Sequence, residues 1–521
     1  MALTLTNIDN LSDSAGVRLA GAVSCAFASI NGKAFVYVAG EDDNGVTSFE
    51  LTPDGFLIPQ DNVNDGDPIL LAGASAVAVA VDEGQPFVFT AGFVDDGLGT
   101  FVALAGGDLL NTDNDDDVDD PALEMDGAAA LTANVFGGIV FVFVAGSNDD
   151  GISMFGINGN DGTASNSVNV QDNATLELNG VDALATASFG PLTNYLFAGG
   201  GADDGISVFS IAELSLTNVE NVDDGDNVAL ELDGVSSLTT AVVGSKTFLF
   251  ACSRVDDGVS VFEIASNGSL TNVDNVTDDA TLELDGASAV HVAKIAGTTY
   301  LFVAGEDDDG VSVFAVAADG SLINFGEIPD RGLRELDGAS AVTTAVAGGK
   351  TFLIVTGSVD DGVSTFAIDT TGVTINGTSG NDVIDALNAP PGELLPSDLG
   401  DTLIGGLGKD TMSGGAGGDF FDFNVKTEST KGANRDVILD FSHGEGDRID
   451  LAGIDAKSGV GGNQRFTFIG KQSFHHEKGE LHFIKKAGFV VVEGDTNGDG
   501  RPDFQIQVDD VNVLRAGDFV L

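Results

Sequence analysis

A sevenfold internal repeat over residues 1–372 constrains the fold of this chain more than any other feature of its sequence. One glycine series follows Asp or Asn and precedes runs such as V-S-V-F, and a second series lies inside runs such as L-D-G-A-S-A-V. Both recur every 52–54 residues, and two independent series with one period indicate a repeat architecture. The first series is Gly45, Gly97, Gly151, Gly205, Gly258, Gly310 and Gly362, and the second is Gly21, Gly73, Gly127, Gly180, Gly234, Gly286 and Gly338.

Each unit contains four short runs of β-branched and aromatic residues, separated by clusters of Gly, Asn and Asp and without a helical period. The sixth unit predicts strands over residues 287–295, 300–304, 311–316 and 321–325. Four strands in each of seven units predict a seven-bladed β-propeller. Small residues in the first run suit an inner strand, where the blades converge, and larger residues such as Phe302 and Phe314 would fill the space between sheets.

The two ends of the repeat region predict how the ring closes. Residues 3–10, L-T-L-T-N-I-D-N, match the fourth run of a unit, while the seventh unit stops after its third run at Ile368. We therefore expect the N-terminal strand to complete the last blade, which would remove two open sheet edges.

The chain is strongly acidic throughout. Residues 1–372 contain 8 Lys and Arg against 58 Asp and Glu, a net charge of −50, and residues 373–521 contain 13 against 24, a net charge of −11. This field disfavours nucleic acid and anionic membranes as partners and favours divalent cations. No apolar run is long enough to span a membrane. Cys25 and Cys252 fall on distant blades, so we expect no disulfide.

Acidic loops should gather on one face of the propeller, because the loop between the second and third strands and the connection to the next blade emerge together. Two interpretations stay open: clustered carboxylates capture Ca²⁺ or have raised pKa values, or Asp-Gly serves only as a tight turn in which glycine takes the positive φ angle and Asp caps its own backbone. The connection at residues 324–334 departs from the repeat by carrying Arg331 and Arg334. An anionic group would bind there, unless these arginines pair with neighbouring carboxylates. His291 is the only histidine of the ring, which favours a packed rather than a catalytic residue.

The blade pattern F-V-Y-V-A-G at residues 35–40, G-V-T-S-F-E-L at residues 45–51 and the following Asp54-Gly55 resembles the seven-bladed lactonase-like propellers. This resemblance implies the architecture, and by analogy a hydrolytic activity.

After residue 372 the sequence changes to nonapeptides. The run G-T-S-G-N-D-V-I-D at residues 377–385 is followed by a ten-residue insert at residues 386–395 and by three contiguous copies. Position six is always Asp and position eight is always apolar. Glycines permit sharp turns that expose carbonyl oxygens, and the Asp supplies a charged oxygen, as a stacked Ca²⁺-binding coil requires. The pattern resembles the RTX, or hemolysin-type, calcium-binding repeat, which implies few Ca²⁺ ions held by these aspartates. The candidate ligands are Asp382, Asp401, Asp410, Asp419, Asp422 and Asp440.

Residues 424–521 resemble the C-terminal domain of serralysin-type proteases in segments such as D-V-I-L-D-F-S-H-G-E-G-D-R-I-D-L at residues 436–451 and the terminal D-F-V-L. The resemblance implies an uncleaved signal for type I secretion, which fits the absence of an N-terminal signal pattern. The protease motif is missing, because residue 480 is Glu where H-E-x-x-H requires His, and His475, His476 and His482 are expected at the surface. Asp495, Asn497, Asp499 and Asp503 have the spacing of an EF-hand loop without its final Glu, so they form either a weak Ca²⁺ site or a structural turn.

These observations predict an all-β chain in three parts: a seven-bladed propeller at residues 1–372, calcium-binding repeats at residues 373–423 and a β domain with a secretion signal at residues 424–521. The expected protein is extracellular or attached to the surface of a Gram-negative bacterium, requires Ca²⁺ and engages a type I secretion apparatus. Its propeller would act as a binding or structural module of a surface layer or matrix, and would contact further copies of itself or a surface glycan or protein. The alternative is a secreted lactonase-like hydrolase.

Overall fold

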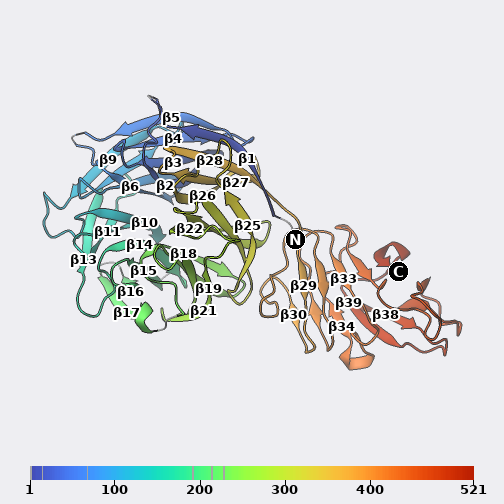
Figure 1. Cartoon of the computed structure of the whole chain (residues 1–521). Coiled ribbons are helices and arrows are strands. Elements are labelled where there is room, and N and C mark those ends of the chain that lie inside the picture. The colour runs from blue at the N-terminus through green and yellow to red at the C-terminus, as the bar shows by residue number, and fades with distance from the viewer. Residues whose placement is uncertain (1–2, 15, 67, 191–192, 213–214, 227–228) are drawn as a thin grey trace.

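A computed structural model describes residues 3–14, 16–66, 68–190, 193–212, 215–226 and 229–521. The first part of the chain forms seven four-stranded antiparallel sheets arranged in a ring (Figure 1). The predicted all-β class and the seven-bladed propeller are therefore confirmed. Blades 1 to 6 are β2–β5, β6–β9, β10–β13, β14–β17, β18–β21 and β22–β25, and blade 7 is formed by β26–β28 with β1.

Each blade runs from an inner strand beside the axis to an outer strand at the perimeter. The inner strands are β2 (Ala22–Ile30), β6 (Ala74–Asp82), β10 (Ala128–Phe136), β14 (Val181–Ser188), β18 (Val235–Val243), β22 (Ala287–Ile295) and β26 (Ala339–Ala347). The second strands are β3 (Lys33–Gly40), β7 (Gln85–Gly92), β11 (Ile139–Gly146), β15 (Asn194–Gly200), β19 (Lys246–Ser253), β23 (Thr298–Gly305) and β27 (Lys350–Gly357). The third strands are β4 (Gly45–Leu51), β8 (Gly97–Ala103), β12 (Gly151–Ile157), β16 (Gly205–Ala212), β20 (Gly258–Ile264), β24 (Gly310–Val316) and β28 (Gly362–Thr370). The outer strands are β5 (Leu57–Asn64), β9 (Leu109–Asp116), β13 (Ala164–Gln171), β17 (Ser215–Asp223), which is followed by η1 (Asp224–Asp226), β21 (Leu270–Thr277), β25 (Leu322–Pro329) and β1 (Leu3–Ser12).

The N-terminal strand closes the ring. β1 pairs antiparallel with β28 from Leu3 opposite Thr370 to Ser12 opposite Gly362, and thereby supplies the missing outer strand of blade 7. Large apolar side chains fill the space between neighbouring blades. One such cluster joins Tyr195 and Phe197 of blade 4 to Phe262 of blade 5.

The two glycine series meet on one face of the ring. The residue before each glycine of the first series has φ between 52° and 58°, and its side-chain oxygen accepts a hydrogen bond from the N–H of the second-series glycine in the next blade. The seven pairs, at 2.7–3.1 Å, are Asn44–Gly73, Asp96–Gly127, Asp150–Gly180, Asp204–Gly234, Asp257–Gly286, Asp309–Gly338 and Asp361–Gly21. The prediction that this glycine takes the positive φ and that Asp caps its own backbone is wrong, because Asp or Asn takes the left-handed conformation and caps the neighbouring blade.

The glycine itself is required by a close approach. A Cβ at Gly258 would lie 2.7 Å from the carbonyl oxygen of Val276 on the outer strand and 2.7 Å from a carboxylate oxygen of Glu231. The repeated Asp-Gly pair therefore encodes both the joint between blades and the space for the outer strand.

Residues after Thr370 form a coil whose short strands alternate between two sheets. One sheet has the order β29 (Thr374–Asn376), β31 (Thr402–Ile404), β33 (Phe420–Asp422), β35 (Arg448–Asp450) and β40 (Phe519–Val520). The other has the order β30 (Val383–Ile384), β32 (Thr411–Met412), β34 (Asp436–Ile438), β39 (Phe504–Asp509), β38 (Phe489–Asp495), β37 (Glu480–Lys485) and β36 (Thr467–Gly470), with η2 (Gly432–Asn434) and η3 (Ala516–Asp518) in the connections. The strands before β36 pair in parallel within each sheet.

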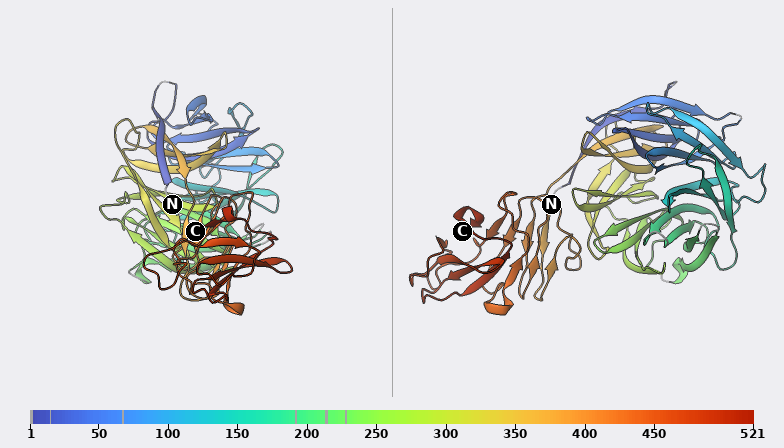
Figure 2. Two further views of the ribbon diagram at one scale, coloured as in Figure 1. Left: turned by 90° about the vertical axis from the view of Figure 1, so that its right-hand side faces the viewer. Right: turned by 180° about the vertical axis from the view of Figure 1, so that it is seen from behind.

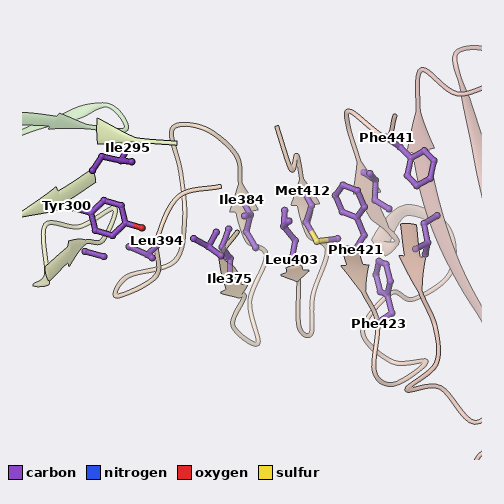
Figure 3. Packing of buried hydrophobic residues seen from close by; sticks show 14 of the residues in the cluster. Ile295, Tyr300, Ile375, Ile384, Leu394, Leu403, Met412, Phe421, Phe423 and Phe441 are labelled. Carbon is purple, nitrogen blue, oxygen red and sulfur yellow. The ribbon is translucent and has the colours of Figure 1, made fainter. Parts of the chain in front are cut away.

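The apolar position eight of each nonapeptide points between these two sheets. Ile384, Leu403, Met412 and Phe421 are all fully buried and form one continuous row (Figure 3). This row gives the coil its core, because each turn contributes a single apolar side chain.

The insert at residues 386–395 lies where the coil meets the ring, close to the N-terminus (Figures 1 and 2). Leu395 packs in the cluster that contains Phe248 of blade 5, and the carbonyl of Glu393 accepts a hydrogen bond from Ala318 N at 3.0 Å. The insert therefore joins the two parts of the chain. Both cysteines are free, as expected, and no helix in the described part of the chain is long and apolar enough to cross a membrane.

Candidate metal centre

Aspartates stand immediately before or at the start of the coil strands and form two ladders along opposite edges. In four of the six aspartates, the carboxylate accepts a hydrogen bond from the backbone N–H of the aspartate one turn earlier. In the first ladder, Asp410 Oδ1 accepts from Asp382 N and Asp436 Oδ1 accepts from Asp410 N, both at 2.8 Å. In the second, Asp419 accepts from Asp401 N at 2.8 Å and Asp447 accepts from Asp419 N at 2.9 Å.

Three of these carboxylates keep one oxygen buried without a hydrogen-bond partner: Oδ2 of Asp410, Asp419 and Asp436. Their exposed fractions are 0%, 1% and 0%. A buried charged oxygen without a partner is costly unless a proton or a cation compensates it. The donor chemistry therefore fits a hard cation such as Ca²⁺, which prefers carboxylate and carbonyl oxygens.

The turn sequence decides which aspartate is left unpaired. Position two of the nonapeptide is glycine in the turns of Asp410 and Asp419, so it offers no hydroxyl to those carboxylates. Position one must also be glycine in the turn of Asp419, because a Cβ at Gly414 would clash with Asp419 Oδ2. In the other two turns position two carries a hydroxyl. Ser397 donates from its Oγ and its N to Asp401 at 2.7 Å each, and Thr378 donates in the same way to Asp382. Of the four repeat aspartates, Asp410 and Asp419 are thus the pair with an oxygen free for metal.

Burial raises the pKa of all three unpaired carboxyls. It reaches about 6 for Asp410 and about 7 for Asp419 and for Asp436, and neighbouring carboxylates on the same ladder add to the effect. Such carboxyls bind a proton or a cation near neutral pH much more readily than an exposed aspartate does.

Asp436 and Asp447 were not among the predicted ligands. Each is followed two residues later by a buried apolar residue, Ile438 and Ile449. That Asp-x-apolar spacing is the one the nonapeptides share, and it would have extended both ladders even where the glycines have been lost.

The predicted ligands Asp440 and Asp422 have hydrogen-bond donors of their own, and the charge of Asp440 helps to raise the pKa of Asp419. Asp440 accepts hydrogen bonds from Ser413 Oγ at 2.6 Å and Gly415 N at 2.9 Å, so it caps the turn before Asp419. Asp422 accepts from Asn424 Nδ2 at 3.2 Å.

The EF-like segment forms a compact turn. Asp495 is fully buried and accepts backbone N–H groups from Asn497, Gly498 and Gly500 at 2.7–3.1 Å. Asp503 accepts from Thr496 N at 2.8 Å, and its hydrogen bonds lower its pKa. Asp499 is exposed and accepts from Arg501 N at 2.9 Å. The carboxylates of this turn therefore have protein donors.

The acidic face of the propeller is also held by hydrogen bonds. A second set of contacts accompanies the seven joints. In every loop, the Asp just before the positive-φ residue accepts a hydrogen bond from the backbone N–H of the residue that precedes the second-series glycine of the same blade. Asp308, for example, accepts from Asp285 N at 2.9 Å. The other six are Asp43, Asp95, Asp149, Asp203, Asp256 and Asp360. These contacts give the loop aspartates a structural role in joining strands and blades. The raised pKa values also occur: burial and nearby carboxylates raise the pKa of Asp117 to about 6 and that of Glu283 to about 7.

Side chains alone do not assemble a metal site in the described ranges, where no three His, Cys, Asp or Glu residues converge around a possible ion. At the coil turns, backbone carbonyls are the other oxygens that could complete a metal site beside the carboxylates. A Cβ at Gly377, Gly406 or Gly408 would clash with the carbonyl of the adjacent turn, so the glycines let these carbonyls stack closely.

A second candidate site is the channel on the propeller axis, a cavity of about 590 Å³. Its mouth breaks the sevenfold symmetry: Arg254 Nε lies 3.3 Å from Glu306 Oε2, and Asp182 of β14 has a pKa raised by burial and opposed by Arg254. His291 faces Thr344 Oγ1 at 3.0 Å, and burial lowers its pKa to about 4, as expected for a packed neutral histidine.

In the C-terminal part, His482 is buried and bonds Glu493 at 2.8 Å, so the prediction that it lies at the surface is wrong.

The fold and these sites define a seven-bladed propeller joined to an aspartate-laddered β coil. No family model and no curated protein matches the chain. Among solved structures, the chain is similar to a putative 6-phosphogluconolactonase from Bacteroides fragilis, with 16% identity over 62% of this chain and 86% of that chain and a TM-score of 0.45. It is also similar to a periplasmic gluconolactonase from Pseudomonas aeruginosa, with 15% identity over 59% and 85% of the two chains and a TM-score of 0.46.

Proposed function

We propose that this protein is a secreted calcium-binding protein whose C-terminal coil is ordered by Ca²⁺ and whose propeller is a binding or structural module. The observation that carries the proposal is the set of buried carboxylate oxygens without partners on Asp410, Asp419 and Asp436. These three aspartates, with the carbonyls of the stacked glycine turns, would hold the ions.

Bound Ca²⁺ would supply positive charge to a ladder of carboxylates that otherwise repel one another. The protein's own residues do the rest: the backbone N–H groups of Asp382, Asp401 and Asp410 each fix one oxygen of the next carboxylate, which leaves the second oxygen aimed into the turn. Metal binding to a site that exists only in the folded chain stabilises the folded chain.

This linkage suits export in an unfolded form. Where calcium is scarce, the unpaired carboxylates weaken the coil, and at millimolar Ca²⁺ outside the cell the coil becomes stable. The resemblance of residues 424–521 to serralysin-type secretion domains supports a type I route from a Gram-negative cell.

Hydrogen exchange on the full chain, measured in excess chelator and in 2 mM Ca²⁺, tests the proposal. We expect protection of residues 373–450 to rise at least a hundredfold with Ca²⁺, while the propeller strands change little. Equal protection of the coil in both conditions would refute a calcium-ordered coil.

For the propeller, the seven similar blades of the repeat support repeated contacts, as in a surface layer or matrix, with another copy or a surface glycan or protein as the partner. Self-association of the full chain on adding Ca²⁺, followed by light scattering, would support this role.

The asymmetric channel mouth favours a second candidate function, hydrolysis of a lactone. Turnover of a lactone that is lost in Asp182→Asn and Arg254→Gln would support the hydrolase, and no turnover across a panel of lactones would exclude it for those substrates.

A further inference from the structure

The outer strands of neighbouring blades are joined by a repeated side-chain contact. An acidic residue on one outer strand accepts a hydrogen bond from the first backbone N–H of the next outer strand, at 2.7–3.0 Å. The five pairs are Asp9–Leu57, Asp61–Leu109, Asp113–Ala164, Glu220–Leu270 and Asp274–Leu322. These contacts close the perimeter at five of the seven blade junctions.

The two remaining junctions lack the acid for different reasons. On β13 the matching residue is Val168, which lies opposite Met154 and packs with Leu216 of the next blade, so apolar contact fills that junction. On β25 the matching residue is Gly326, opposite Val313, and a Cβ built there would meet nothing within 4 Å. Among the described residues, the junction between β25 and the closing strand β1 therefore has neither an acidic contact nor a side chain at the matching position of β25.

A cavity of about 350 Å³ opens at this junction. One side is the N-terminal strand with Leu3 and Leu5, and the other is β25 with Phe325 and Ile328. Tyr300 packs edge-to-face on Phe325 with ring centroids 5.9 Å apart, which fixes the apolar wall. The volume is at the lower end of the roughly 300–1,000 Å³ typical of small-molecule sites.

The charge of this cavity is opposite to that of the surrounding ring. Its charged lining residues are Arg331, Arg334 and Glu327, a net charge of +1 in a propeller of net charge −50. Within the described residues neither arginine forms an ion pair, although the charge of Arg331 opposes the raised pKa of Glu283 and that of Arg334 opposes the raised pKa of Asp330. Arg334 Nη1 instead donates to the carbonyl of Pro329, and its guanidinium lies 5.6 Å from the centroid of the Phe366 ring. Arg334 is thus held in place, and Arg331 is exposed at the cavity edge.

From this arrangement we infer that the junction between blades 6 and 7 is a binding site for a small monocarboxylate with an apolar tail. The tail would lie between Leu5 and Phe325, and the carboxylate would meet Arg331 and Arg334, because guanidinium groups form strong charge-assisted hydrogen bonds with carboxylates. No lining residue of the site belongs to the coil, although Leu5 and Phe325 pack against the apolar cluster that continues into it, and the inference does not depend on the calcium proposal.

The chain contains no Trp, so a single introduced Trp reports on one place. Thr4→Trp puts the reporter on the exposed face of β1 at the cavity, and Asp108→Trp puts it at the matching position beside the closed Asp61–Leu109 junction. Octanoate is the probe, and octylamine has the same tail with the opposite charge.

We expect octanoate to change the Thr4→Trp fluorescence saturably and to leave Asp108→Trp unchanged, and octylamine to have no effect. Adding Arg331→Gln to the reporter should weaken octanoate binding at least tenfold. Equal responses from both reporters, or unchanged affinity in Arg331→Gln, would overturn the inference. Calorimetric titration of the unsubstituted chain with octanoate gives an independent reading, and no heat of binding up to 10 mM would also overturn it.

Discussion

Replacing Asp419 by Asn should make the calcium-free protein more stable at alkaline pH. Burial raises the pKa of Asp419 from 3.8 to about 7, so its ionised form is disfavoured in the folded coil. At 1.36 kcal/mol for each pKa unit, the ionised carboxyl costs about 4 kcal/mol above pH 7. The folded coil therefore has its full stability below pH 3.8, loses it as the pH rises from 3.8 to 7, and bears the whole cost at pH 8.5.

Asparagine removes this cost but accepts a weaker hydrogen bond from Asp401 N, which subtracts about 1–2 kcal/mol. In excess chelator at pH 8.5, Asp419→Asn should gain about 2–3 kcal/mol, which raises the midpoint of the coil transition by about 4–12 °C in calorimetry of the full chain. At pH 4 the variant should lose about 1 kcal/mol. In millimolar Ca²⁺ it should lose part of the stabilisation that the unsubstituted protein gains.

Asp401→Asn is the matched control. Both oxygens of Asp401 already accept hydrogen bonds, from Ser397 and Val373, so an amide there loses donors and should destabilise the coil at both pH values in chelator. If Asp419→Asn is destabilised in chelator at pH 8.5 as much as Asp401→Asn is, then Asp419 does not carry an uncompensated charge, and the reasoning fails.

Three further predictions concern the propeller, and the first two are measured by thermal unfolding of the full chain. Gly258→Ala should cost about 1–3 kcal/mol because the added methyl overlaps the outer strand, whereas Gly16→Ala, with open space around it, should be close to neutral; equal effects would contradict the close-approach argument. Asp257→Ala should cost about 2–3 kcal/mol, since it loses the hydrogen bond to Gly286 N and places Ala at positive φ, while Asp257→Asn should cost less than about 1 kcal/mol; a similar loss in both would show that the hydrogen bond to Gly286 N is not what Asp257 contributes. Deletion of residues 1–12 exposes the edge of β28 and should cause oligomers on size-exclusion chromatography; a stable monomer would refute the closure role of β1.

The repeat made the ring predictable, because the period, the strand count and the placement of β1 all follow from local patterns. The direction of the Asp-Gly contacts was not predictable in this way. Whether Asp257 caps its own turn or the N–H of Gly286 depends on how closely two blades approach each other. The sequence of one repeat unit does not specify that distance. The length of β25 shows the same limit: it continues to Pro329, four residues beyond the predicted end, through an irregularity near Asn324 that keeps it paired with β24.

In the coil, spacing alone identified the aspartate positions but treated them as equivalent. The structure separates Asp410 and Asp419 from Asp382 and Asp401 through a contact four residues away along the chain, where a hydroxyl replaces glycine. Asp436 was not predicted as a ligand because its turn has no glycine doublet, although it begins a strand of the same coil.

The most direct test of the calcium-bound coil is a count of Ca²⁺ ions on the full chain by equilibrium dialysis at pH 7.5, compared with the triple variant Asp410→Asn, Asp419→Asn and Asp436→Asn. The account predicts tightly bound Ca²⁺ on the unsubstituted chain and its loss in the variant. An unchanged number of bound ions in the variant, or no bound Ca²⁺ on the unsubstituted chain, would contradict it.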